Sequence, residues 1–143
     1  MSEIEKQVQK VFEGYKTAVF EKDVEAFLGH YTEDVHIFDM WGKWSYEGIH
    51  AWRGMVTGWF GSLGDERVVV DFDDVQINGT DDVAVAHAYV TFKALSSDGQ
   101  ELRSMNNRLT LALKRTSNGW KVFHEHSSAP IDGDTLQVML KRA

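Results

Sequence analysis

Residues 83–130, "VAVAHAYVTFKALSSDGQELRSMNNRLTLALKRTSNGWKVFHEHSSAP", decide the fold. They contain three β-rich runs, 83–96, 100–115 and 119–128, separated by the turn sequences "SSDG" and "TSNG". A fourth run, 66–77, precedes them and is joined to them through "NGTDD". Asn-Gly and Asp-Gly pairs between strand-like runs are strong hairpin signals. The second half of the chain is therefore predicted to be a four-stranded antiparallel meander with long strands, which normally bend.

The first half of the chain is mainly helical. The first twenty residues have apolar side chains at three- and four-residue spacing, which is typical of an amphipathic helix. A short second helix is expected to open at Asp23, a good N-cap, and a third to span about 48–61. Between them, "DVHIFDM" (34–40) alternates and predicts a strand. Residues 1–143 are therefore expected to form a single α+β domain whose helices cover one face of the sheet.

Composition excludes several functional classes. The chain has 143 residues and no cysteine, which excludes disulfides, thiolate zinc sites and cysteine nucleophiles. A net charge of −7 argues against nucleic acid or an anionic membrane as a partner. The beginning of the chain lacks the pattern of a signal peptide, and no apolar run approaches the length of a membrane span. We therefore expect a cytoplasmic protein without nucleic-acid or membrane partners.

The run 83–94 separates into two faces with different side chains. One face carries Ala84, Ala86, Ala88, Val90 and Phe92, and the small alanines would leave a hollow beneath the helices. The other face, with His87 and Tyr89, is too apolar to be fully exposed to water, and we expect it to lie at the interface of a homodimer.

The order of elements, closed by "GWKVFHEHSSAP", resembles the nuclear-transport-factor-2-like superfamily, and within it the SnoaL-like and ketosteroid-isomerase-like branch. The resemblance extends from Val8 to Pro130. It implies a cone-shaped, curved antiparallel sheet wrapped around the N-terminal helices, known as a cystatin-like α+β roll. It also implies one deep pocket at the open end of the cone, suited to a small-molecule ligand.

The same resemblance implies two catalytic residues. In "EGYKTAVFEKDVEAF", Tyr15 stands eight residues before Asp23, as in the isomerase pattern. In "YTEDVHIFDM", Asp39 falls on the position of the proton-shuttling base. The isomerases also have a protonated acid on the penultimate strand, whereas the corresponding stretch here, "SMNNRLTLAL", contains no acid.

The residues themselves support these roles but leave alternatives open. Asp39 shares a side with Val35 and Ile37, and desolvation among nearby tryptophans (Trp41, Trp44) would raise its pKa toward the range useful for proton transfer. Alternatively, it ends the strand at the surface and caps the next turn. Tyr15 lies on the apolar helix face, where its hydroxyl either donates to an enolate-like oxygen or bonds a backbone carbonyl.

Two histidines near the end of the last strand are further candidates. His124 and His126 are two residues apart and therefore face the same side, as in some metal sites, but no nearby glutamate and third histidine complete such a set. We therefore expect neither a metal nor another cofactor. We assign His126 to the pocket rim as a catalytic hydrogen-bonding group and count His124, packed beside it, among the substrate-binding candidates. A β-bulge in this strand would change the side that both face.

The remaining substrate-binding candidates come from one helix and two strands. Trp52, Met55 and Trp59 form a stripe that is either plain core or the wall of an apolar hollow for a flat organic ligand. Arg108 lies mid-strand among leucines, so it should pair with an acid or reach an anionic ligand. The other candidates are Ala88, Phe92 and Asn107.

Two functions remain open. The first is a small-molecule enzyme of the proton-transfer type (isomerase, cyclase, dehydratase or epoxide-opening hydrolase) that uses Asp39 with Tyr15 and His126. The second is a non-catalytic ligand-binding or oligomerisation module, because the closing residues also resemble the association domain of calcium/calmodulin-dependent kinase. Since the chain holds this fold alone, we expect a free dimeric ligand-binding protein or enzyme.

Overall fold

The first two of the three described helices begin at a side-chain N-cap, and all three bury apolar residues. The computed structural model describes residues 2–142. Helix α1 (Glu3–Glu21) begins at Ser2, whose side chain accepts a hydrogen bond from the backbone N–H of Glu5, and it buries six residues on one face. Asp23 caps α2 (Val24–Leu28) in the same way through the N–H of Ala26. Helix α3 is Ile49–Ser62.

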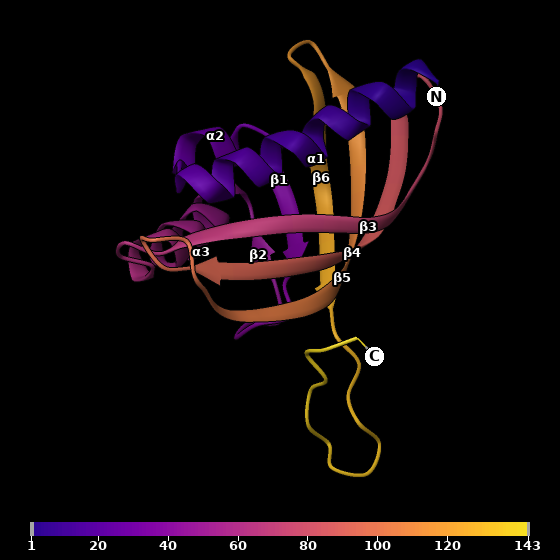
Figure 1. Cartoon of the computed structure of the whole chain (residues 1–143). Coiled ribbons are helices and arrows are strands. Elements are labelled where there is room, and N and C mark those ends of the chain that lie inside the picture. Colours follow the sequence, from indigo (N-terminus) through magenta and orange to yellow (C-terminus); the bar gives the residue numbers. More distant parts are fainter. Residues whose placement is uncertain (1, 143) are drawn as a thin grey trace.

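Six strands form one sheet in the order β2-β1-β6-β5-β4-β3. Their bounds are β1 (Tyr31–Phe38), β2 (Tyr46–Glu47), β3 (Arg67–Gly79), β4 (Val83–Leu95), β5 (Glu101–Thr116) and β6 (Gly119–Ser128). The predicted meander is present as β3 to β6, each antiparallel to the next. Figure 1 shows these long strands curving around the helices, and the predicted α+β fold class is confirmed.

The expectation of a purely antiparallel sheet is wrong at one pair. β1 lies parallel to β6, while the short β2 pairs antiparallel with β1, so the sheet is mixed. The parallel pairing arises because α3 and the rest of the meander separate β1 from β6 in the chain. The two strands thus meet without a hairpin to impose an antiparallel direction.

The narrow part of the cone is filled by side chains. Phe12 on α1 meets Phe72 on β3 edge to face, with ring centroids 4.8 Å apart. Ala84, Ala86 and Ala88 on β4 are buried in this core. The prediction that these small residues leave a hollow is wrong, because all three are buried in the core cluster; the cavity lies farther along β4, from Val90 to Ala94.

A one-residue bulge interrupts β6. Leu113 of β5 pairs with Val122, but the next residue, Ala112, pairs with His124, so Phe123 has no partner across the ladder. Its ring lies beneath the ammonium group of Lys114, 5.6 Å from the ring centroid. Beyond a bulge, the side chains of a strand change the face that simple alternation would give them.

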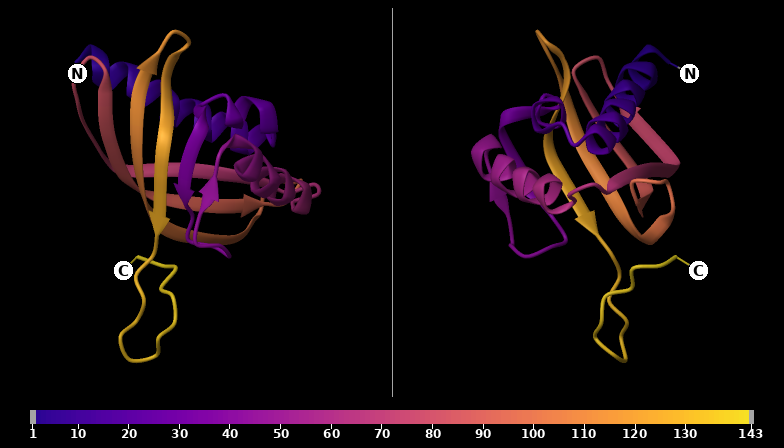
Figure 2. Two further views of the ribbon diagram at one scale, coloured as in Figure 1. Left: turned by 180° about the vertical axis from the view of Figure 1, so that it is seen from behind. Right: turned by 60° about the vertical axis from the view of Figure 1, so that its left-hand side comes forward.

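The segment that follows β6, residues 129–142, leaves the sheet and then returns to it. Figure 2 shows it projecting beyond the end of β6 as a loop and coming back beside β5. An isolated bridge between Ile131 and Val138 closes the base of the loop. Near its end, the backbone N–H of Asn106 donates to the carbonyl oxygen of Leu140 at 2.7 Å.

Candidate functional site

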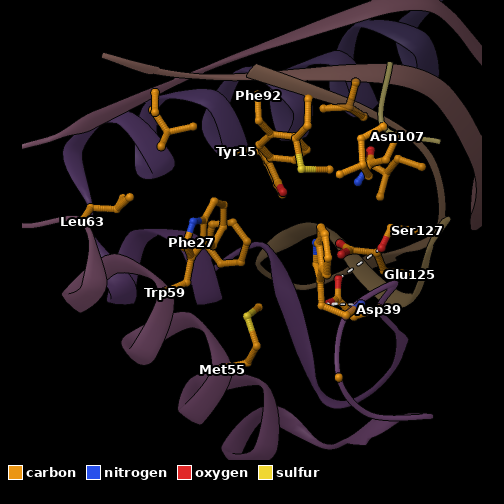
Figure 3. Close-up of a pocket in the computed structure, with 18 of the residues that line it drawn as sticks. Tyr15, Phe27, Asp39, Met55, Trp59, Leu63, Phe92, Asn107, Glu125 and Ser127 are labelled. Atoms are coloured by element: carbon orange, nitrogen blue, oxygen red, sulfur yellow. Dashed lines mark hydrogen bonds between the residues drawn. The ribbon is translucent and has the colours of Figure 1, made fainter. Parts of the chain in front are cut away.

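A cavity of about 570 Å³ opens at the wide end of the cone. It lies between α3, the loop that follows β1, and the inner faces of β3 to β6 (Figure 3). This volume falls within the range of small-molecule sites, about 300–1,000 Å³. The loop after β1 turns at Gly42, whose φ of 76° is a conformation that glycine adopts without strain.

One end of the cavity is apolar. Phe27 of α2, Met55 and Trp59 of α3, and Phe92 of β4 line it, with Leu63 at its limit (Figure 3). The rings of Trp59 and Phe92 meet edge to face, with centroids 6.1 Å apart. This end suits the flat apolar part of an organic molecule.

The other end is polar and acidic. Asp39, Glu125, Ser127 and Asn107 gather there, and the hydroxyl of Tyr15 points into the space beside them (Figure 3). Arg103 is the one cationic residue among those that line the described cavity; it is exposed and bonded to Glu66 at 2.6 Å. The acidic end therefore disfavours an anionic ligand.

Asp39 is a half-buried carboxylate fixed by hydrogen bonds around one serine. The Oγ of Ser127 donates to Oδ1 of Asp39 at 3.1 Å, and it accepts from the backbone N–H of Met40 at 3.1 Å. The N–H of Trp41 donates to Oδ2 at 3.4 Å. Burial raises the pKa of Asp39 above its usual value, and the hydrogen bonds only partly oppose this shift. Trp41 does line the cavity, but Trp44 is 98% exposed and cannot desolvate this carboxylate.

Glu125 is the most deeply buried charged residue of the site, with 3% of its surface exposed. The hydroxyl of Tyr31 donates to its Oε1 at 2.6 Å. Burial raises the pKa of Glu125 to about 7, the hydrogen bond from Tyr31 lowers it, and the negative charge of Asp39 adds to the rise. The charge of Asp39 thus favours the protonated form of Glu125.

Burial and the charges of Glu125 and Asp39 also raise the pKa of the Tyr15 hydroxyl well above its usual value. That hydroxyl therefore stays protonated and can act as a hydrogen-bond donor across the ordinary pH range.

The two predicted histidines lie outside the cavity. His126 is exposed on the convex face of the sheet, and Nδ1 of His124 lies 2.7 Å from the backbone carbonyl oxygen of His36 on that same face. The assignment of His126 to the pocket rim and of His124 to substrate binding is therefore wrong. The bulge at Phe123 is the physical reason, because it turns Glu125 and Ser127 inward in their place.

The predictions that Arg108 and Ala88 bind the substrate are also wrong, because neither side chain lines the cavity. Arg108 points away from the cavity and its Nε donates to Oγ of Ser128 at 3.1 Å, because its neighbour Asn107 takes the inward position. Ala88 is buried in the core and does not line the cavity.

The structure does bring the other seven candidates together. Tyr15, Asp39, Trp52, Met55, Trp59, Phe92 and Asn107 all line the cavity. Glu125, Ser127, Tyr31 and Phe27 were not predicted from the sequence. The "EHSS" run contains the first two, but only the position of the bulge decides whether the acid or the histidines face inward.

The described residues 2–142 contain no cluster of three or more histidine, aspartate or glutamate side chains able to hold a metal ion. Within the same residues, none of the helices combines the length and apolar character needed to cross a membrane.

Known proteins place this geometry in context. The model of the SnoaL-like domain family matches residues 8–132. No curated protein matches the chain significantly. Among solved structures, the chain is similar to an NTF2-like protein of unknown function from Pseudomonas putida KT2440. That protein has a TM-score of 0.85 and 23% identity, over 98% of this chain and 96% of the other.

Two other solved structures are similar in fold. Aln2 from a Streptomyces species has a TM-score of 0.79 and 16% identity, over 90% of this chain and 91% of the other. A protein of unknown function with a cystatin-like fold from Nostoc punctiforme has a TM-score of 0.70 and 14% identity. That similarity covers 89% of this chain and 92% of the other.

Proposed function

The chain belongs to the SnoaL-like domain family, and from that premise we propose that it is a proton-transfer enzyme acting on a flat, apolar carbonyl compound. SnoaL-like domains bind small molecules. The reaction class proposed here is isomerisation, or a related cyclisation or dehydration, that begins by removing a proton from the carbon beside a carbonyl group.

One observation carries this proposal: two carboxyl groups in different surroundings meet at one end of an apolar cavity. Asp39 is half-buried and receives hydrogen bonds from Ser127 and Trp41, which favour its ionised form. Glu125 is fully buried, and its higher pKa favours the protonated form below about pH 7. Such a pair of environments is how enzymes separate a base from an acid.

The proposed step needs no further group. The Asp39 carboxylate takes the proton, and the C–H electron pair becomes the double bond of an enolate. A negative charge develops on the enolate oxygen. The O–H of Glu125 or of Tyr15 stabilises this charge by donating a hydrogen bond to the oxygen. Protonated Asp39 then returns the proton to a different carbon, which completes an isomerisation without net gain or loss of protons. His126 has no part in this scheme because it lies on the opposite face of the sheet.

Two probes test the proposal. The neutral naphthalene ketone prodan should bind with a Kd on the order of 10 μM and show blue-shifted emission, because the apolar end of the cavity excludes water. The bicyclic ketone 2-tetralone should displace prodan, and the protein should accelerate deuterium uptake beside its carbonyl group in D₂O, followed by NMR. Binding without accelerated exchange would favour the second candidate function, a ligand-binding or oligomerisation module, and absence of binding would contradict the site.

We also propose that the protein is a homodimer formed through the convex face of the sheet. Val83 and Val85 of β4 are exposed there, and His87 lies beside them. On the same face, the guanidinium group of Arg142 stacks on the ring of Tyr89 in its own chain. A second chain bound to this face would therefore contact both residues. Exposed apolar side chains grouped on one sheet face are typical of an interface.

Light scattering at micromolar concentration should give about twice the chain mass of 16.3 kDa. Val85→Lys should shift the mass toward a single chain, because it brings a charge into the interface. Thr57→Lys, on the exposed side of α3, serves as the control and should leave the dimer intact. A wild-type protein of single-chain mass would contradict the assignment.

A further inference from the structure

The segment after β6 fills an edge that β6 leaves open. β6 pairs with β5 only as far as Ser128 opposite Arg108, so residues 101–107 of β5 have no β6 residue beside them. An unpaired edge presents free backbone N–H and C=O groups. Residues 139–142 return to this edge after the loop, as the left panel of Figure 2 shows beside β5.

Four contacts hold the returning residues in place. In addition to the bond from Asn106 N–H to Leu140, the N–H of Arg142 donates to Oδ1 of Asn106 at 2.8 Å. The Nζ of Lys141 donates to Oγ of Ser104 at 2.6 Å. The guanidinium group of Arg142 lies 3.6 Å from the ring centroid of Tyr89, within the range of a cation–π interaction. The segment is thus fixed to both β5 and β4.

Within residues 129–142, Leu140 differs from the other large apolar side chains in its burial. Ile131, Leu136, Val138 and Met139 are exposed, Leu136 to 77%. Leu140 is half-buried and lines the cavity beside Ser104 and Met105. Its neighbours in the chain remain in solvent, so general collapse of the segment does not explain its burial.

We infer that Leu140, held in place by its neighbours in residues 139–142, forms part of the ligand site as a wall residue that sets the affinity for an apolar ligand at the β5 side. This inference rests on the proposed function only in taking the cavity to bind a small molecule. Leu140 lies outside the sheet and the helices.

Matched leucine substitutions at positions 140 and 136 test the inference. Leu140→Ala removes apolar contact surface from the cavity, and we expect it to weaken prodan binding roughly 5-fold. Leu136→Ala makes the same chemical change in the same segment at an exposed position, and prodan binding should be unchanged. Equal effects of the two substitutions would overturn the inference.

A second measurement needs no ligand. Because the chain has no cysteine, Met105→Cys places a single thiol on the cavity wall beside Leu140. N-ethylmaleimide should label this thiol severalfold faster when Leu140→Ala is added, and at an unchanged rate when Leu136→Ala is added. Equal labelling rates in all three proteins would show that Leu140 does not cover the wall. If the wild type binds no prodan, the proposed function fails while thiol labelling still decides the position of Leu140.

Discussion

Replacing Asp39 by asparagine should abolish most of the proton transfer to and from 2-tetralone while leaving prodan binding nearly intact. A general base contributes typically about 100- to 10,000-fold to a reaction rate, and we expect deuterium exchange to slow by that factor. Asparagine keeps the size and the acceptor oxygen that Ser127 bonds, so the loss arises from the missing base rather than from a changed cavity.

The matched control is Asp34→Asn, which removes an exposed carboxylate from the same strand, β1. It should exchange 2-tetralone at the wild-type rate. An Asp39→Asn protein that binds prodan and still exchanges 2-tetralone at full rate would show that Asp39 is not the base. Loss of both binding and exchange would instead indicate that Asp39 supports the shape of the cavity.

The second large effect concerns stability and its dependence on pH. Glu125 has a pKa of about 7 in the folded protein, against 4.5 for an ordinary glutamate. Between these two values the folded protein binds more protons than the unfolded chain, so the contribution of this residue to stability falls as pH rises. The contribution is fully present below about pH 4.5 and is lost by about pH 7, a difference of about 3 kcal/mol.

Glu125→Gln should therefore stabilise the protein at pH 8 by about 3 kcal/mol, measured by chemical unfolding at several pH values. Glutamine keeps an acceptor oxygen for the hydroxyl of Tyr31 and carries no charge to desolvate. The gain should disappear below about pH 4.5, where Glu125 itself is neutral in both states.

Glu101→Gln, at an exposed position at the start of β5, is the control and should leave the pH dependence as in the wild type. A Glu125→Gln protein with unchanged stability at pH 8 would mean that the carboxylate is well solvated in the folded protein. Glu125 lowers the stability of the folded protein near and above neutral pH. A carboxyl group at such a cost is typical of a residue with a role in function rather than in folding.

The fold was predictable because its signals are local and repeated. Turn pairs such as Asp98-Gly99 separate long alternating runs, and Asp23 caps a helix where the pattern required one. The positions of Asp39 and Tyr15 in the site were predicted from the same signals together with the family resemblance. Asp39 lies at the end of an alternating strand and Tyr15 on the apolar face of a helix, so the facing of both side chains could be predicted.

The rest of the site depends on contacts that no local pattern records. The facing of Glu125 is set by how β6 pairs with β5, and that pairing contains the bulge at Phe123. Arg108 was assigned to the wrong face because leucines flank it, although the facing follows from its inward neighbour Asn107. Leu140 belongs to an irregular segment without periodicity, and only its return to Asn106 brings it to the cavity.

The bulge at Phe123 also affects how site residues should be transferred between relatives that share 14% to 23% of their residues with this chain. Phe123 is the extra residue of its strand, so a homologue that lacks it presents the same inward positions with one residue fewer. Aligning such a homologue without a gap at 123 would set its inward acid against His124. A one-residue gap placed at Phe123 aligns that acid with Glu125, so the placement of this gap decides whether an acid or an imidazole is assigned to the cavity of the homologue.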